Sequence, residues 1–211
     1  MTQAALSFEI IRHHRIDYEA AWEMQQKRVG EVVAGRAGHT LYLLEHSPVY
    51  TLGRSGKVEE VLDDSTREKI PLVETDRGGR VTYHGPGQMI AYVVWDLRPH
   101  SRMVRKHVTR LEESILKTLS SLGITATREP DNPGVWVDRA KIAALGVRIT
   151  RGVAYHGVAL NRDPDLSHFD GIIPCGLQGR PVTSLAKLGV DITREELEER
   201  YLAAFREVFE G

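Results

Sequence analysis

One short segment constrains the fold of this chain more than any other: RGGRVTYHGPGQ, residues 77–88. Its glycines are Gly78, Gly79, Gly85 and Gly87. Glycine costs backbone entropy on folding, so such a cluster indicates turns with positive φ or a close approach of the backbone to a ligand. Val81 and Tyr83 alternate between the glycine pairs and predict a short strand. The segment is therefore either a ligand-binding loop or a tight hairpin with an incidental histidine, His84.

The single cysteine, Cys175, lies in GIIPCGL, residues 171–177. A solitary cysteine is commonly a small buried hydrophobic residue. Here a proline precedes it and a glycine follows it, which predicts a strand end or a turn where the sulfur faces a cleft. Because a thiol with the ordinary pKa of about 8.5 is mostly protonated at neutral pH, a nucleophilic role needs a base or a cation nearby. The sequence offers Lys141, His84 and His156.

Lys141 opens KIAALGVRI, residues 141–149, an apolar stretch that predicts a buried or half-buried strand. In one interpretation the lysine lies at the mouth of the strand with its ammonium in water. In the other, its stem crosses an apolar floor and its amine lies in a site, where desolvation favours the neutral form that accepts a proton.

Length and charge limit the class of protein. A chain of 211 residues predicts one domain, residues 1–211, and a formal net charge of -1 argues against a nucleic-acid partner. Basic side chains nevertheless gather in the candidate site segments: Arg54, Lys57, Arg77, Arg80, Lys141, Arg148 and Arg151. They form either a local positive rim that suits acidic partners or a scatter of solvated side chains.

Several kinds of site and location have no support in the sequence. Residues 1–15 lack the basic start and apolar core of a signal peptide, and no later run approaches membrane-spanning length, so we expect a cytoplasmic protein with no membrane partner. No histidine falls in HExxH or in a paired Cys/His spacing, which predicts no metal. GRSGK, residues 53–57, lacks the spacing of a phosphate loop, and no GxGxxG opens a helix, so no cofactor is expected.

Periodicity predicts alternating strands and helices. Strands are expected at residues 8–11, 39–45, 72–75 and 89–97. A helix should follow Asp17, with an apolar stripe that Gln25 interrupts, and a second should run from Val104 to a stop at Gly123. Thr193 and Glu196 predict a capping box for the last helix. Its expected buried face is Leu197, Tyr201, Ala204, Phe205 and Val208.

Three strings, RGGRVTYHGPGQ, KIAALGV and GIIPCGL, occur in the order and approximate spacing of one family. Further matches are PVYTLGRSG at 48–56, YHGVALN at 155–161 and PVTSL at 181–185. Across nearly its whole length the chain resembles the octanoyltransferases of lipoate biosynthesis, the lipoyl(octanoyl) transferases. The resemblance implies an α+β fold, a mixed β-sheet flanked by helices in a single biotin/lipoate protein ligase-like domain.

The same resemblance implies a catalytic dyad of Cys175 and Lys141. Cys175 would take an octanoyl group from octanoyl-acyl carrier protein as a thioester. The ε-amine of a lysine on a lipoyl domain would then take it as an amide, while Lys141 moves the protons. The implied acceptors are the lipoyl domains of 2-oxoacid dehydrogenase E2 subunits and the glycine cleavage H protein.

The acyl pocket and its mouth are expected to use residues from the RGG, KIAALGV and YHGVALN segments. The predicted substrate-binding residues are Arg77, Gly78, Gly79, Tyr83, His84, Gly85, Gly87, Gln88, Ala144, Leu145, Gly146, His156 and Gly157. His84 is either a general base or a hydrogen-bonding wall residue, and the same choice applies to His156. Amides near Gly78, Gly79 and Gly146 are candidate oxyanion donors.

Other functions remain open at this point. The closest is an ATP-dependent lipoate or biotin protein ligase, which shares the implied fold but needs no cysteine nucleophile. A catalytically silent acyl-binding or carrier-docking protein would bind the octanoyl donor without forming a covalent bond. A cysteine hydrolase has less support because the chain shows no recognisable Cys-His-Asn signature.

Overall fold

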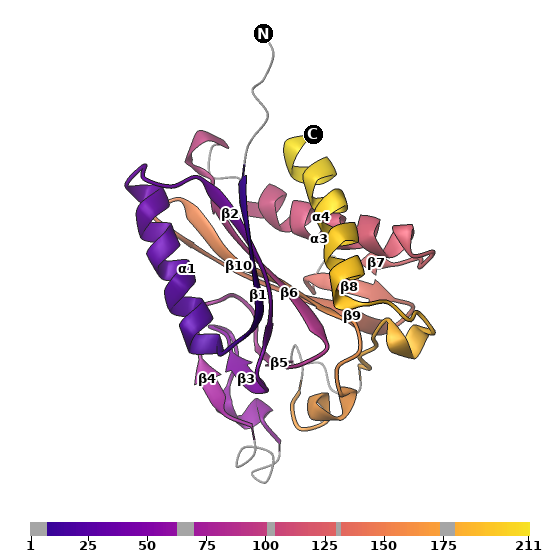
Figure 1. Ribbon diagram of the computed structural model, residues 1–211. Coiled ribbons are helices and arrows are strands. Elements are labelled where there is room, and N and C mark those ends of the chain that lie inside the picture. The colour runs from indigo at the N-terminus through magenta and orange to yellow at the C-terminus, as the bar shows by residue number, and fades with distance from the viewer. Residues whose placement is uncertain (1–7, 63–69, 101–103, 130–131, 174–179) are drawn as a thin grey trace.

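A seven-stranded sheet organises the fold (Figure 1). The computed structural model describes residues 8–62, 70–100, 104–129, 132–173 and 180–211, so Cys175 lies outside the described residues. In spatial order the strands are β1 (Phe8–Ile16), β2 (His39–His46), β6 (Gln88–Asp96), β10 (Val153–Asn161), β9 (Ala140–Thr150), β8 (Gly134–Val137) and β7 (Thr127–Arg128). β1 runs parallel to β2 and all other neighbours are antiparallel, so the sheet is mixed.

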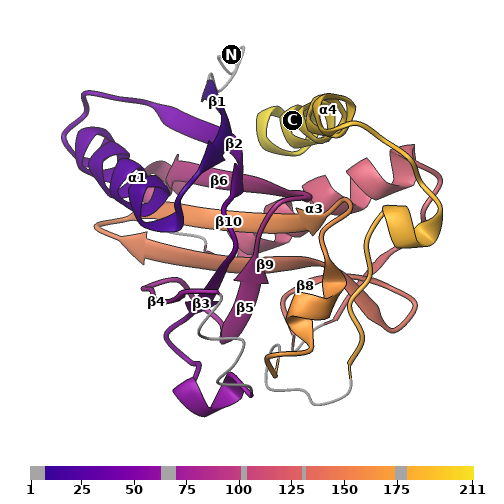
Figure 2. The ribbon, with the colours of Figure 1, turned by 60° about the horizontal axis from the view of Figure 1, so that its bottom comes forward.

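A second, three-stranded sheet carries the glycine-rich segment. Its strands in order are β4 (Leu72–Glu74), β3 (Val49–Leu52) and β5 (Val81–His84). β5 is the short strand predicted between two glycine turns, and both Gly79 and Gly87 have positive φ, 89° and 87°. Figure 2 shows this small sheet beside β9, where its loops reach the large sheet.

Helices cover both faces of the large sheet (Figure 1). α1 (Tyr18–Val33) packs on one face, and α3 (Val104–Ser121) and α4 (Arg194–Glu210) pack on the other. Short 3₁₀ turns occur at Val58–Glu60, Arg98–His100, Leu166–Phe169 and Ala186–Leu188. Within the described residues, no helix has the length and apolar character needed to cross a membrane.

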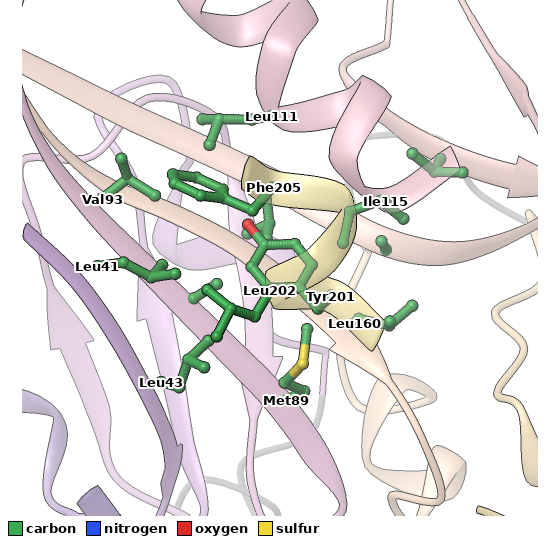
Figure 3. Packing of buried hydrophobic residues seen from close by; sticks show 14 of the residues in the cluster. Leu41, Leu43, Met89, Val93, Leu111, Ile115, Leu160, Tyr201, Leu202 and Phe205 are labelled. Carbon is green, nitrogen blue, oxygen red and sulfur yellow. The ribbon is translucent and has the colours of Figure 1, made fainter. Parts of the chain in front are cut away.

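The central strand β6 is buried on both faces because helices lie above and below it. Met89, Ala91, Val93 and Trp95 alternate into the core beneath α3 and α4, and Ile90, Tyr92 and Val94 alternate into the core beneath α1. Figure 3 shows the larger core, where Tyr201 and Phe205 of α4 meet Leu111 and Ile115 of α3 above the sheet. The alternation fixes which residues of each strand reach either core.

The predicted α+β fold with a mixed sheet and flanking helices is confirmed. The capping box of α4 is also present: the Thr193 side chain accepts from the Glu196 amide, and Glu196 Oε2 accepts from the Thr193 amide at 3.1 Å. The predicted buried face of this helix is wrong at Val208, which is half-buried, and it omits Leu202 and Phe209, which are buried.

The helix starts and stops differ in detail from the sequence patterns. Asp17 is the N-cap of α1, but its side chain makes no cap bond and instead accepts from Ser47 Oγ at 2.8 Å. Gly123 follows the end of α3 with φ of 76°, the conformation in which glycine terminates helices. The first strand continues to Ile16, well past the predicted end at residue 11.

His107 of α3 is a buried titratable group outside the cavity lining formed by the described residues. It is 3% exposed, packs edge-on against Phe209 at 5.8 Å, and its Nε2 has no hydrogen-bond partner among the described residues. Burial, with smaller contributions from Arg110 and His39, lowers its pKa to about 4. An unfolded histidine has a pKa of about 6.5, so below that pH the unfolded state binds more protons than the folded state.

We predict that this histidine destabilises the protein in acid, with the loss developing as pH falls from 6.5 towards 4. In His107→Leu, the fall in the free energy of unfolding between pH 7 and pH 4.5 should be smaller by about 2 to 3 kcal/mol. Urea unfolding at both pH values measures this, with exposed His14→Leu as the control. If the free energy of unfolding falls by the same amount in His107→Leu as in wild type, the His107 ring is protonated in the folded state at pH 4.5.

Candidate functional site

A cavity of about 330 Å³ lies where the small sheet meets β9 and β10. Its lining includes Lys141 and most of the predicted substrate-binding residues. These are Arg77, Gly78, Gly79, His84, Gln88, Ala144, Leu145, Gly146, His156 and Gly157. The sequence segments that carry them are far apart in the chain, and the fold brings them to one place.

The guanidinium of Arg77 shapes the glycine loop from inside. The side chain is buried, and its Nη2 donates to the Thr51 carbonyl at 2.6 Å and to the Arg80 carbonyl at 2.7 Å. Its Nε and Nη2 also donate to Thr51 Oγ1, at 3.1 and 2.8 Å. Thr51 belongs to the PVYTLGRSG motif, so one role of that motif is to receive Arg77.

Backbone hydrogen bonds fasten the loop at residues 76–80, here called the RGG loop, to its neighbours. Arg54 N donates to the Arg77 carbonyl at 3.0 Å, and Ser55 N donates to the Gly79 carbonyl at 3.1 Å. On the other side, Gly78 N donates to the Val147 carbonyl of β9 at 3.0 Å. The Gly78 amide is therefore already paired, which argues against its predicted use as an oxyanion donor.

Glycine at position 146 is required for the contact between the RGG loop and β9. A Cβ there would lie 2.8 Å from the Gly78 carbonyl oxygen and 3.2 Å from Arg77 Cδ. Both distances are shorter than ordinary carbon contacts, so a side chain at Gly146 would push the RGG loop away from β9.

Lys141 is buried, 6% exposed, so the interpretation that its ammonium lies in water at the strand mouth is wrong. Its Nζ donates to Asn132 Oδ1 and to the Pro133 carbonyl, both at 3.2 Å. The same nitrogen lies 4.8 Å from the ring centroid of Trp136, a cation–π contact. These partners direct the amine to the wall of the cavity.

Two further segments position the Lys141 backbone and stem. The chain passes alongside Lys141 at the PVTSL motif, where Lys141 N donates to the Pro181 carbonyl and Thr183 N donates to the Lys141 carbonyl, each at 3.0 Å. Gly134 leaves room for the stem, because a Cβ there would lie 3.0 Å from Lys141 Cε and 3.2 Å from Nζ.

His84 lies on the cavity wall as a neutral ring. Gln88 Nε2 donates to Asn161 Oδ1 at 2.9 Å, which leaves Gln88 Oε1 as the acceptor for His84 Nδ1 at 3.1 Å. This pattern assigns the proton to Nδ1. Burial, followed by the nearby His46 and Arg77, lowers the pKa of His84 well below its usual value. A ring so weakly basic favours the wall role over general-base catalysis.

His46 lies behind this wall and is also neutral. Its Nδ1 is 2.8 Å from the Ile16 carbonyl and its Nε2 is 2.7 Å from the hydroxyl of Tyr92, a cavity residue. Burial lowers the pKa of His46 to about 4. Since both histidines stay uncharged, this end of the cavity suits an apolar ligand rather than an anion.

His156 has an unusual backbone for a strand residue, with φ of 61°. Its amide donates to Gln25 Oε1 of α1 at 2.8 Å, and its Nε2 lies 2.9 Å from Asp76 Oδ1. Burial lowers the pKa of His156, and the bond to Asp76 offsets only part of that effect. Burial raises the pKa of Asp76, but bonds from His156 and Tyr155 outweigh it and leave that pKa lowered.

Tyr83, Gly85 and Gly87 were expected at the pocket, but they lie outside the cavity lining formed by the described residues. The Tyr83 ring packs against Tyr50 and Phe169 in a separate cluster. A Cβ at Gly85 would lie 2.0 Å from the Tyr83 hydroxyl oxygen, so this glycine makes room for the tyrosine. Gly87 supplies a turn that accepts hydrogen bonds from the amides of residues 162 and 163.

The predicted basic rim is only partly exposed. Arg77 and Lys141 are buried, and Arg80 pairs with Glu60. Arg54, Lys57 and Arg151 are exposed. Within the described part of the chain, no group of three or more His, Cys, Asp or Glu residues is arranged to hold a metal ion.

Sequence reasoning missed several residues that build the site. Asn132 reaches Lys141 from a loop that carries no motif, so no signal marked it. Gln25 left a usable signal, because a polar residue that interrupts an apolar helix stripe needs a buried hydrogen-bond partner. Asp76 directly precedes the RGG motif, and only the fold shows that it contacts β10.

The sequence of this chain matches one family model and several relatives. The family model for the lipoyl protein ligase A/B catalytic domain matches residues 17–206. An octanoyltransferase of Magnetococcus marinus is 54% identical over 192 residues, covering 91% of this chain and 89% of the relative. An octanoyltransferase of Bradyrhizobium sp. is 44% identical over 209 residues, covering 94% of this chain and 85% of the relative.

Solved structures extend the likeness to the fold. A putative lipoate protein ligase of T. acidophilum, Ta0514, solved with bound lipoic acid, has a TM-score of 0.72 at 16% identity, covering 96% of this chain and 86% of that chain. A lipoate-protein ligase A bound with ATP has a TM-score of 0.70 at 17% identity, covering 95% and 84%. Because the family model spans most of the sequence and the relatives align nearly end to end, the chain belongs to the lipoyl protein ligase A/B catalytic domain family, among its octanoyltransferases.

Proposed function

We propose that this acyltransferase moves an octanoyl group from octanoyl-acyl carrier protein to a lysine of a lipoyl domain, through a thioester on Cys175. The acceptors would be the lipoyl domains of 2-oxoacid dehydrogenase E2 subunits and the glycine cleavage H protein. The observation that carries the proposal is Lys141, a buried lysine on the wall of an apolar cavity, in a chain related to octanoyltransferases.

The cavity suits an acyl chain. Much of its lining is aliphatic, including Val81, Leu145, Val147 and Val158. Its volume of about 330 Å³ is at the lower end of the range for small-molecule sites. Each methylene of a bound octanoyl group would contribute about 0.8 kcal/mol by leaving water.

Cys175 lies outside the described residues, and its role rests on the family resemblance and on its neighbours in the chain. Phe169, before it, and Val182, after it, both line the cavity. Pro181 and Thr183 bond to the Lys141 backbone. The chain is therefore at the cavity on both sides of the cysteine, which supports its assignment as the nucleophile.

In the first step, the Cys175 thiolate would attack the carbonyl carbon of the donor thioester. The bond between that carbon and the sulfur of the carrier breaks, and the carrier leaves as a thiol after it gains a proton. Lys141 is the proposed proton shuttle: it takes the proton of Cys175 and then supplies one to the departing sulfur. One thioester replaces another, so the step needs no ATP.

In the second step, the ε-amine of the lipoyl-domain lysine would attack the octanoyl-enzyme. The new carbon–nitrogen bond forms the amide, and the carbon–sulfur bond to Cys175 breaks. The attacking amine must lose a proton, and Lys141 is the proposed acceptor. Amide formation from a thioester is downhill, which gives the overall transfer its direction.

The covalent intermediate is the first test. Wild-type protein incubated with octanoyl-acyl carrier protein, without acceptor or ATP, should gain the mass of one octanoyl group in intact-protein mass spectrometry. Cys175→Ala should gain none, and hydroxylamine or an added lipoyl domain should remove the adduct from wild type. If no adduct forms while ATP and free octanoate modify the lipoyl domain, the protein is a ligase. Donor binding without either reaction would identify an acyl-binding protein.

Removing the amine should slow the first step without emptying the cavity. Lys141→Met keeps a long unbranched side chain and loses proton transfer, so adduct formation should fall about 10²- to 10⁴-fold. Rapid-quench mass spectrometry at saturating donor measures this rate. A variant that acylates at the wild-type rate would remove Lys141 from the mechanism.

Gly134 should be needed for the position of Lys141. In Gly134→Ala, the new Cβ would crowd the Lys141 stem and the Ala143 carbonyl, so the rate of adduct formation should fall at least about tenfold. Gly189→Ala is the matched control, because Gly189 also has positive φ, 80°, but nothing lies within 4 Å of its Cβ position. Gly189→Ala should lose about 1 kcal/mol of stability from backbone strain. Gly134→Ala should lose more, because its Cβ also lies 2.7 Å from the Ala143 carbonyl oxygen. Equal rates in the two variants would contradict the role of Gly134.

A further inference from the structure

The ladder between β10 and β6 is interrupted beside the cavity. Val153 and Ala154 pair with Asp96 and Trp95, and pairing resumes at Gly157 with Tyr92. Tyr155 and His156 lie between these pairs and have no partner in β6, although both pair with β9. At Tyr155 and His156, β10 therefore stays paired with β9 but not with β6.

The cause is the left-handed backbone of His156, with φ of 61°. This conformation costs a side-chain-bearing residue about 1 to 2 kcal/mol and persists only where surrounding contacts compensate. The amide that no longer bonds to β6 donates instead to Gln25 Oε1 at 2.8 Å. Gln25 is fully buried, and its Nε2 donates to the Ala21 carbonyl at 3.2 Å, so its orientation is fixed.

The left-handed residue changes where two neighbouring side chains point. Successive residues of a regular strand face opposite sides of the sheet. Here the rings of Tyr155 and His156 stack, with centroids 4.8 Å apart and planes at 24°. His156 also approaches Trp22 of α1, at 6.4 Å between rings, so both side chains lie on the α1 side.

Together these two side chains hold one carboxylate. The Tyr155 hydroxyl donates to Asp76 Oδ2, and His156 Nε2 bonds to Asp76 Oδ1 at 2.9 Å. Asp76 is the first residue of the RGG loop, and Arg77, Gly78 and Gly79 that follow it line the cavity. A chain of contacts therefore runs from Gln25 through His156 and Asp76 to the cavity wall.

We propose that Gln25 is a positioning residue that sets which acyl groups the enzyme accepts. By holding the left-handed backbone of His156, it fixes Asp76 and keeps the RGG loop against β9, which limits the space for the acyl chain. Gln25 lies on α1 and is absent from the cavity lining formed by the described residues, so it acts through the loop rather than on the substrate. The inference rests on the proposed function, because it names what limits the acyl group in that reaction.

The test compares adduct formation from hexanoyl-, octanoyl-, decanoyl- and dodecanoyl-acyl carrier proteins. In Gln25→Leu the ratio of octanoyl to dodecanoyl rates should fall about tenfold or more relative to wild type, because a loosened loop admits longer chains. Gln26→Leu is the matched control, since Gln26 is the adjacent glutamine of α1 and is exposed. That control should keep the wild-type ratio.

A second variant tests the inference even if Gln25→Leu fails to fold. Asp76→Asn alters the loop end of the same contact chain and leaves α1 intact, so it should shift the ratio in the same direction. The double variant should shift the ratio no further than the larger single effect, because both changes break one connection. Thermal unfolding of every variant gives the accompanying loss of stability.

Several outcomes would overturn the inference: rates that fall equally for all four donors, a ratio as high in Gln25→Leu as in Gln26→Leu, or a wild type without chain-length preference. If wild type forms no adduct with any donor, the proposed function fails instead. Calorimetric binding of free octanoate and dodecanoate then decides the inference separately. The octanoate preference should be present in wild type and reduced in Gln25→Leu.

Discussion

The contact between the RGG loop and β9 is the constraint on which the site depends. The Gly78 amide donates to the Val147 carbonyl and so joins the RGG loop to β9 beside the cavity. This hydrogen bond forms because neither Gly78 nor Gly146 places a side chain between the two backbones. Arg77 fills the space within the loop and bonds to Thr51, so the loop is supported from within as well as from its neighbours.

The polar side chains around the buried cavity are either uncharged or paired. His46 and His84 stay neutral because burial lowers their pKa values, and each has hydrogen-bond partners that fix its ring. The buried amine of Lys141 has oxygen acceptors and an aromatic face instead. Paired in this way, polar side chains line a cavity without the cost of unpaired buried charge. Apolar side chains and the Lys141 amine therefore line one cavity.

The sequence predicted the elements better than the positions of individual side chains. Val81 and Tyr83 were correctly placed on a short strand between glycine turns, because turn chemistry and alternation are local properties. The same pattern gave no means to tell that Val81, Thr82 and His84 line the cavity while Tyr83 does not. Lys141 had two interpretations in the sequence, and the partners that decide between them, Asn132 and Trp136, belong to other segments.

By itself, the sequence determined the family through its long motifs, and the resemblance to that family implied the α+β fold. Periodicity and caps located the helices and several strands, because these signals are written in neighbouring residues. Only the tertiary structure decided that His156 leaves the β6 ladder and that Gln25 receives its amide. These residues are far apart in the chain, and a left-handed histidine inside a strand contradicts local preference. Such a conformation is stable only through partners from other elements, and those partners cannot be identified from the sequence around His156.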